Sequence, residues 1–151
     1  MQKRQQQIFK KMDKSISQLE GWKWKNEIPT RETHGGVECR FYELHNQPIS
    51  NLDLSDIRFL IGQNSGLEYL VPIAISKLKE DIFLEVEYYP GDLFCALLLI
   101  NNEPNYWKSH SKEKQELIDL YTEQKRNLGS IDATDEIFQK IKEAYKDFLS
   151  K

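Results

Sequence analysis

Residues 61–78, IGQNSGLEYLVPIAISKL, constrain the fold most, because this apolar stretch carries its own start signal. Ser65 and Glu68 fit a capping box, in which each side chain pairs with a free backbone N–H of the other residue. The apolar residues that follow are too many for one amphipathic stripe, so we expect a central helix enclosed by other helices. They are Leu67, Leu70, Val71, Ile73, Ala74, Ile75 and Leu78. Because Pro72 removes one helical hydrogen bond, we also expect a kink there.

The first 20 residues also have helical spacing. Their apolar residues recur every three or four positions, at Ile8, Met12, Ile16 and Leu19. We expect one helix here, which Gly21 ends. The first part of this helix, residues 1–14, either packs on the domain or forms a helical extension.

Residues 21–50 change to a different period. Apolar and polar residues alternate around Trp22, Trp24, Val37, Cys39 and Phe41. An alternation of period two favours one or two short extended segments, or a small hairpin. This is the only stretch for which the sequence predicts β structure.

The helices downstream have recognisable boundaries. Asp53 is a good N-cap for a helix that Gly62 can end, and Asp92 can cap the apolar run LFCALLLI. Two further helices are expected at about residues 111–127 and 132–149. The fold class is therefore mostly α: about six helices packed round a central kinked helix, with a short extended or hairpin segment in residues 21–50. At 151 residues the chain is expected to form a single domain, 1–151.

Composition excludes several classes of function. The net charge of −3 argues against nucleic acid or an anionic membrane as a partner. No signal peptide or membrane span is recognisable, and the two cysteines, Cys39 and Cys95, are expected to be free thiols in a reducing cytoplasm. The three histidines lack the spacing of metal ligands, so we expect neither a metal nor a cofactor.

The segment EDIFLEVEYYPGD, residues 80–92, is strongly acidic. It holds five acidic residues and no basic one, with two tyrosines among them. Glu85 and Glu87 are candidates for an acid/base pair in a small hydrolase, which needs a cleft and two different environments. A solvated loop with Asp92 as a helix cap and an acidic protein-binding surface are the other interpretations.

Two blocks in this region are more specific than a generic helix pattern. They are DIRFLIGQNSGLEYLVP, from Asp56 to Pro72, and YPGDL, from Tyr89 to Leu93. With them the chain resembles, over about residues 15–108, the immunity proteins of contact-dependent growth inhibition (CDI) systems. The resemblance implies a cytoplasmic bacterial protein, not an enzyme, that binds a cognate toxin domain, commonly a nuclease, and blocks its active site.

The acidic segment supplies the predicted toxin contacts, because charge steers association and aromatic side chains anchor interfaces. The predicted contact residues are Asp81, Glu85, Glu87, Tyr88 and Tyr89. Contacts of immunity proteins usually vary within a family, so the block residues Gly62, Gln63, Pro72, Pro90 and Gly91 are expected to maintain the fold instead. The alternatives are a small hydrolase using Glu85 and Glu87, or an adaptor that binds proteins other than toxins.

Overall fold

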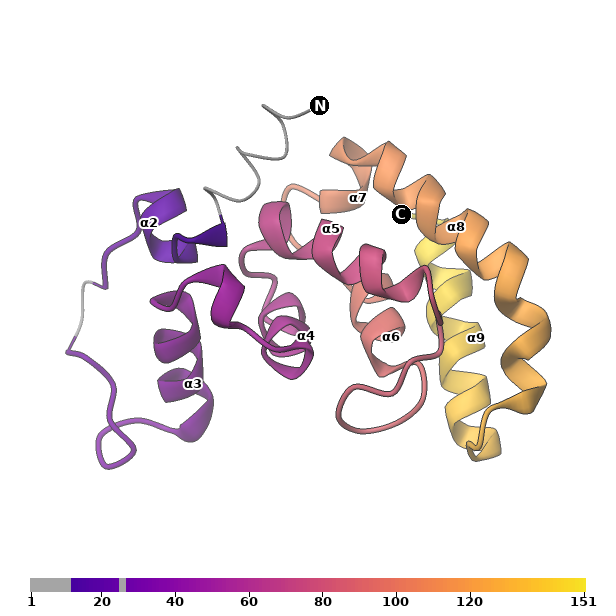
Figure 1. The fold of residues 1–151 in the computed structure, drawn as a ribbon, viewed down its shortest axis with the longest axis horizontal. Coiled ribbons are helices and arrows are strands. Elements are labelled where there is room, and N and C mark those ends of the chain that lie inside the picture. The colour runs from indigo at the N-terminus through magenta and orange to yellow at the C-terminus, as the bar shows by residue number, and fades with distance from the viewer. Residues whose placement is uncertain (1–11, 25–26) are drawn as a thin grey trace. The chain divides into compact units, whose positions relative to one another are not determined.

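The structure is a computed structural model that describes residues 12–24 and 27–151, and Figure 1 shows its helices in chain order. Within these residues it contains eight α-helices, two 3-10 helices and no β-strand, which confirms the mostly α fold. The chain divides into two compact units, residues 1–56 and 57–151, which we call unit 1 and unit 2. The single domain, 1–151, stays a prediction.

Unit 1 begins with the short helix α2, Ile16–Glu20. Ser15 and Gln18 form a capping box at its start, and Gly21 ends it in the left-handed conformation with φ 63°. The single helix predicted for residues 1–20 is therefore wrong around residues 13–15, because the chain turns there before Ser15 starts α2. Residues 1–11 of that prediction lie outside the described part.

The second helix of unit 1, α3, spans Gly36–His45, within the stretch predicted to be extended. The extended or hairpin segment in residues 21–50 is therefore wrong for these positions. Cys39 and Leu44 are buried, whereas Val37 is 58% exposed. Three alternating apolar residues were too short a pattern to distinguish a strand from a half-buried helix. A 3-10 helix, η1, follows at Ile49–Asn51.

Helix α4, Leu54–Gly62, starts as predicted and ends differently. Asp53 and Asp56 exchange hydrogen bonds between carboxylates and backbone N–H groups, at 2.8 and 3.1 Å. Gly62 is still helical, and the left-handed residue is Asn64, with φ 55°. The N–H groups of Asn64 and Ser65 donate to the carbonyls of Ile61 and Leu60, which is a Schellman ending.

Helix α5, Leu67–Leu78, is the predicted central helix of unit 2, with Pro72 inside it. Its N-cap is Gly66 in the left-handed conformation, so the predicted capping box is wrong. The Glu68 carboxylate instead lies 3.0 Å from Nε2 of His110. The helix buries one stripe and exposes Pro72, so it is not enclosed on all sides. The buried residues are Leu67, Leu70, Val71, Ala74, Ile75 and Leu78.

The remaining helices of unit 2 pack around α5 and α6 (Figure 1). They are α6 (Asp92–Leu98), α7 (Tyr106–Ser109), α8 (Ser111–Gln124), the 3-10 helix η2 (Lys125–Ser130) and α9 (Asp135–Leu149). Helix α6 lies against α9, and α5 lies against α8 and α6. Trp107 is 1% exposed and donates its indole N–H to the Leu97 carbonyl at 3.2 Å.

Candidate partner-binding surface

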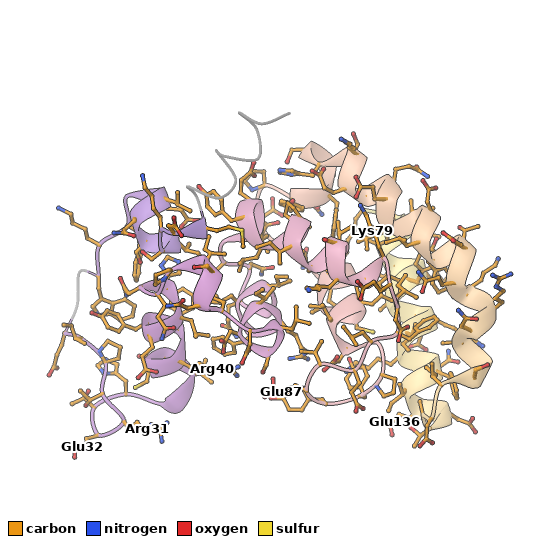
Figure 2. All side chains as sticks on the ribbon, viewed as in Figure 1. Arg31, Glu32, Arg40, Lys79, Glu87 and Glu136 are labelled. Atoms are coloured by element: carbon orange, nitrogen blue, oxygen red, sulfur yellow. The ribbon has the colours of Figure 1, made fainter. Side chains whose placement is uncertain are left out.

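The acidic segment forms the loop between α5 and α6 in unit 2, drawn below the label of α6 in Figure 1. We call residues 80–91 the acidic loop. Asp81, Glu85 and Glu87 are exposed, Tyr88 is 63% exposed, and Tyr89 is half-buried. Figure 2 labels Glu87 on this loop. The five predicted contact residues therefore lie on one loop, and four of them are exposed to solvent.

The loop folds around the carboxylate of Asp92, the first residue of α6, which is fully buried. Its two oxygens accept hydrogen bonds from the backbone N–H groups of Val86 at 2.8 Å, Glu87 at 2.9 Å and Tyr88 at 2.9 Å. The prediction of Asp92 as the N-cap of α6 is wrong, because Gly91 occupies that position. Asp92 satisfies the donors of the preceding loop instead, which fixes the backbone that carries Glu87 and Tyr88.

Arg58 of α4 connects this carboxylate to the exposed face of the loop. Its Nε lies 3.5 Å from Oδ2 of Asp92, which is an ion pair without hydrogen-bond geometry. Its guanidinium carbon lies 4.7 Å from the centre of the Tyr88 ring, a cation–π distance. Arg58 therefore both balances the buried charge of Asp92 and supports the ring of a predicted contact residue.

Tyr89 is contacted by α9. The ammonium of Lys140 lies 4.7 Å from the centre of the Tyr89 ring. Burial, followed by the neighbouring Cys95, raises the pKa of the Tyr89 phenol, and the contact with Lys140 lowers it. Burial likewise raises the pKa of the Cys95 thiol, so it remains protonated. Both cysteines are free, as predicted, and both are buried.

The turn that closes the loop depends on Gly91. Its φ of 85° is left-handed, and an added Cβ would lie 3.1 Å from Cδ1 of Ile141 on α9. The N–H of Gly91 donates to the Leu84 carbonyl at 3.3 Å, and Glu85 forms an isolated bridge with Pro90. Glycine therefore serves both the backbone conformation and the close approach of α9.

The exposed residues of this surface were predicted from the sequence, whereas the contacts that hold them in place were not. Arg58 lies in the first sequence block and Asp92 in the second. The presence of one basic and one acidic residue in the two blocks was the only sequence signal for an ion pair between them. Lys140 lies 51 positions downstream of Tyr89 in sequence, on a helix whose charges gave no indication of this contact.

The carboxylates of Glu85 and Glu87 are exposed to water rather than enclosed in the two different environments that an acid/base pair requires. Among residues 12–24 and 27–151, no group of three or more His, Cys, Asp or Glu side chains is arranged to hold a metal ion. Over the same residues, no helix has the length and apolar character needed to cross a membrane.

A family model described as CDI immunity proteins matches residues 18–117, about two thirds of the chain. The chain belongs to the family of CDI immunity proteins. The matched residues include α4, α5, the acidic loop and α6, so the Arg58–Asp92 pair lies inside the family region, whereas α9 lies beyond it. Comparison with curated proteins and with solved structures gave no significant match.

Proposed function

We propose that this CDI immunity protein acts in the cytoplasm, where it binds a cognate toxin domain through the acidic loop and blocks the toxin's active site without catalysis. The observation that carries the proposal is a loop whose acidic and aromatic side chains are exposed while its backbone is fixed to the buried Asp92. A surface that is ordered before binding loses less conformational entropy when the complex forms.

The charge of the loop supports a proposal for the kind of toxin. Its exposed acids are Asp81, Glu85 and Glu87, and Tyr88 offers a large ring beside them. A nuclease domain presents positive charge to the phosphates of its substrate, so an acidic inhibitor associates quickly and opposes that charge in the complex. We therefore propose a nuclease as the cognate toxin, with Glu85 and Glu87 close to its substrate-binding groups.

The first experiment is a binding and activity assay with the toxin domain encoded next to the gene for this protein. The wild-type protein is expected to form a stable complex with this domain and to abolish its activity at a one-to-one ratio. Absence of a complex would reject toxin neutralisation. A complex with a toxin that does not cleave nucleic acid would reject the nuclease part of the proposal alone.

The second experiment tests the loop itself by stopped-flow association at several salt concentrations. The double charge reversal Glu85→Lys and Glu87→Lys is expected to lower the association rate constant about tenfold or more and to reduce its salt dependence. Its matched control is Glu103→Lys with Glu123→Lys, which makes the same change of net charge at exposed positions of unit 2. An unchanged rate for the loop variant would place the interface elsewhere.

A further inference from the structure

Leu99 is an exception within the most buried segment of unit 2. It ends α6 and is 50% exposed, whereas Leu97, Leu98 and Ile100 are fully buried. Exposed leucines are common singly and need no explanation by themselves. The surroundings of Leu99 are what give it a role.

Leu99 lies where two depressions of the surface of unit 2 meet. One, of about 560 Å³, lies along α9, and the other, of about 250 Å³, lies beside the end of α4. Leu99 and Lys140 line both. We call the larger depression the Leu99 surface, defined by Leu99, Glu136, Lys140, Glu143 and Asp147.

The Leu99 surface continues into the acidic loop. Tyr89 lines the smaller depression together with Arg58, and the Tyr89 ring contacts Lys140, which belongs to both depressions. Figure 2 shows the side chain of Glu136 on α9 and that of Glu87 on the acidic loop, both within unit 2. One connected surface therefore runs from Arg58, which contacts the Tyr88 ring, through Tyr89 to Leu99.

The charge of the Leu99 surface has the same sign as that of the loop. Its rim carries three acids, Glu136, Glu143 and Asp147, of which Asp147 lies 3.8 Å from Nζ of Lys151. Its one basic residue, Lys140, is engaged by the Tyr89 ring. An exposed apolar side chain within a charged rim has the composition of an interface anchor, and an acidic rim favours a basic partner.

The acidic loop is too small to form a whole interface by itself. A stable complex buries about 800 Å² on each partner, which takes roughly 20–30 residues a side. The five predicted loop contacts fall far short of that. The remaining area has to come from surface that adjoins the loop, and the Leu99 surface adjoins it with matching charge.

We propose that the Leu99 surface is the second half of the toxin interface, where it receives an apolar side chain of the toxin flanked by lysine or arginine. This inference rests on the proposed function. In it, the acidic loop opposes the basic active site of the toxin, and Leu99 anchors an adjacent part of the same domain. Because the defining residues other than Leu99 come from α9, beyond the family region, this half also sets which toxin is bound.

The test is a pair of leucine truncations measured against the neighbouring toxin domain by surface plasmon resonance. Leu99→Ala is expected to raise Kd at least tenfold, mostly through faster dissociation, as for an interface anchor. Leu149→Ala removes an equally exposed leucine, 49% against 50%, from outside the Leu99 surface and is expected to change Kd less than twofold. Equal effects of the two truncations, or a Kd for Leu99→Ala within twofold of wild type, would overturn the inference.

A second variant guards against a folding effect of the leucine truncation. Glu143→Lys reverses an exposed charge of the rim and is expected to slow association with the toxin at least threefold, with an unchanged melting temperature. The same change at Glu123, which is exposed on α8, serves as its control. An unaltered association rate for Glu143→Lys would count against the inference as directly as a silent Leu99→Ala.

The remaining outcomes separate this inference from the proposed function. If wild type binds the toxin and the Glu85/Glu87 variant fails while Leu99→Ala does not, only the second half of the interface is rejected. If wild type does not bind the toxin, both are rejected. A wild-type dimer in sedimentation that Leu99→Ala converts to a monomer would assign this surface to a second copy of the chain and overturn the inference.

Discussion

The two units of the chain differ in both charge and the kind of buried polar group that they contain. Unit 1 has eight acidic and nine basic residues, whereas unit 2 has 16 acidic and 12 basic residues. Unit 1 buries a histidine, His45, among aromatic rings. Unit 2 buries a carboxylate, Asp92, that holds an exposed loop.

The contrast shows how each unit uses a buried polar side chain. In unit 1, Trp22 and Phe41 pack on His45, with ring centres at 4.6 and 5.0 Å, and Ser17 Oγ lies 2.7 Å from its Nδ1. These contacts stabilise the unit itself. In unit 2, the buried group fixes a loop that presents charge to solvent. Acidity and an ordered loop therefore coincide in unit 2, where the proposed toxin surface lies.

The largest effect is expected from Asp92→Ala. Removing one member of a buried ion pair, and the acceptor of three backbone N–H groups, is expected to lower the free energy of unfolding by about 3–5 kcal/mol. Hydrogen exchange is expected to rise most at Val86, Glu87 and Tyr88. Asp81→Ala, which removes an exposed carboxylate that accepts one hydrogen bond from the Phe83 N–H, is expected to lower the free energy of unfolding by about 1 kcal/mol. Similar losses for both would reject Asp92 as the organiser of the loop.

The corresponding change in unit 1 is Trp22→Ala. Trp22 forms edge contacts with Trp24 at 5.3 Å, His45 at 4.6 Å and Phe41 at 6.2 Å. We expect a loss of about 2 kcal/mol in urea unfolding, since aromatic pairs each contribute about 0.5–1.5 kcal/mol beyond burial. Ile28→Ala, at a 57% exposed residue, is expected to have little effect. If Trp22→Ala accelerates hydrogen exchange equally in both units, the single-domain prediction gains support over separate units.

Two glycines of unit 2, Gly91 and Gly62, are expected to respond in opposite directions to substitution by alanine. Gly91→Ala is expected to destabilise the protein by about 1–2 kcal/mol, because alanine is strained at φ 85° and its Cβ crowds Ile141. Gly62 is helical with open space around it, so Gly62→Ala is expected to stabilise α4 by about 0.5–1 kcal/mol. Thermal melts of both variants check the pair. A destabilising Gly62→Ala would restore the sequence-based role of Gly62 as the helix end.

The smallest expected effect concerns pH and unit 1. Burial lowers the pKa of His45 from its ordinary 6.5, so the unfolded chain takes up its proton first and stability falls as pH drops through and below 6.5. Burial raises the pKa of Glu20, whose carboxylate lies 3.9 Å from Nε2 of His45, and this contributes stability that is lost as pH rises.

The two contributions oppose each other, so the measurement needs a variant that separates them. In Glu20→Gln, urea unfolding midpoints are expected to fall between pH 7.5 and 5.5, and the further change His45→Gln is expected to remove that fall. A midpoint that stays constant over this range in Glu20→Gln would show that His45 is not buried in its neutral form.

Helices followed from the sequence wherever the apolar pattern and the boundary signal agreed. Helix α9 has apolar residues at helical spacing along its whole length, and Asp53 with Asp56 is a local cap that forms between neighbours in sequence. Helix α3 was missed because only three alternating residues, Val37, Cys39 and Phe41, supported the extended prediction. The side chains of Cys39 and Leu44 are buried because of how α3 packs, and a short sequence pattern does not encode that packing.

The sequence by itself determined that the protein is mostly helical and that residues 80–92 are strongly acidic. It also determined that the chain carries the blocks of a CDI immunity protein. These are properties of composition and of neighbours along the chain. Tertiary structure alone decided that Asp92 serves the loop before it rather than its own helix, and that Lys140 meets Tyr89 from α9. The reason is physical: a carboxylate binds whichever N–H groups the folded backbone brings within about 3 Å, and no local rule states which those are.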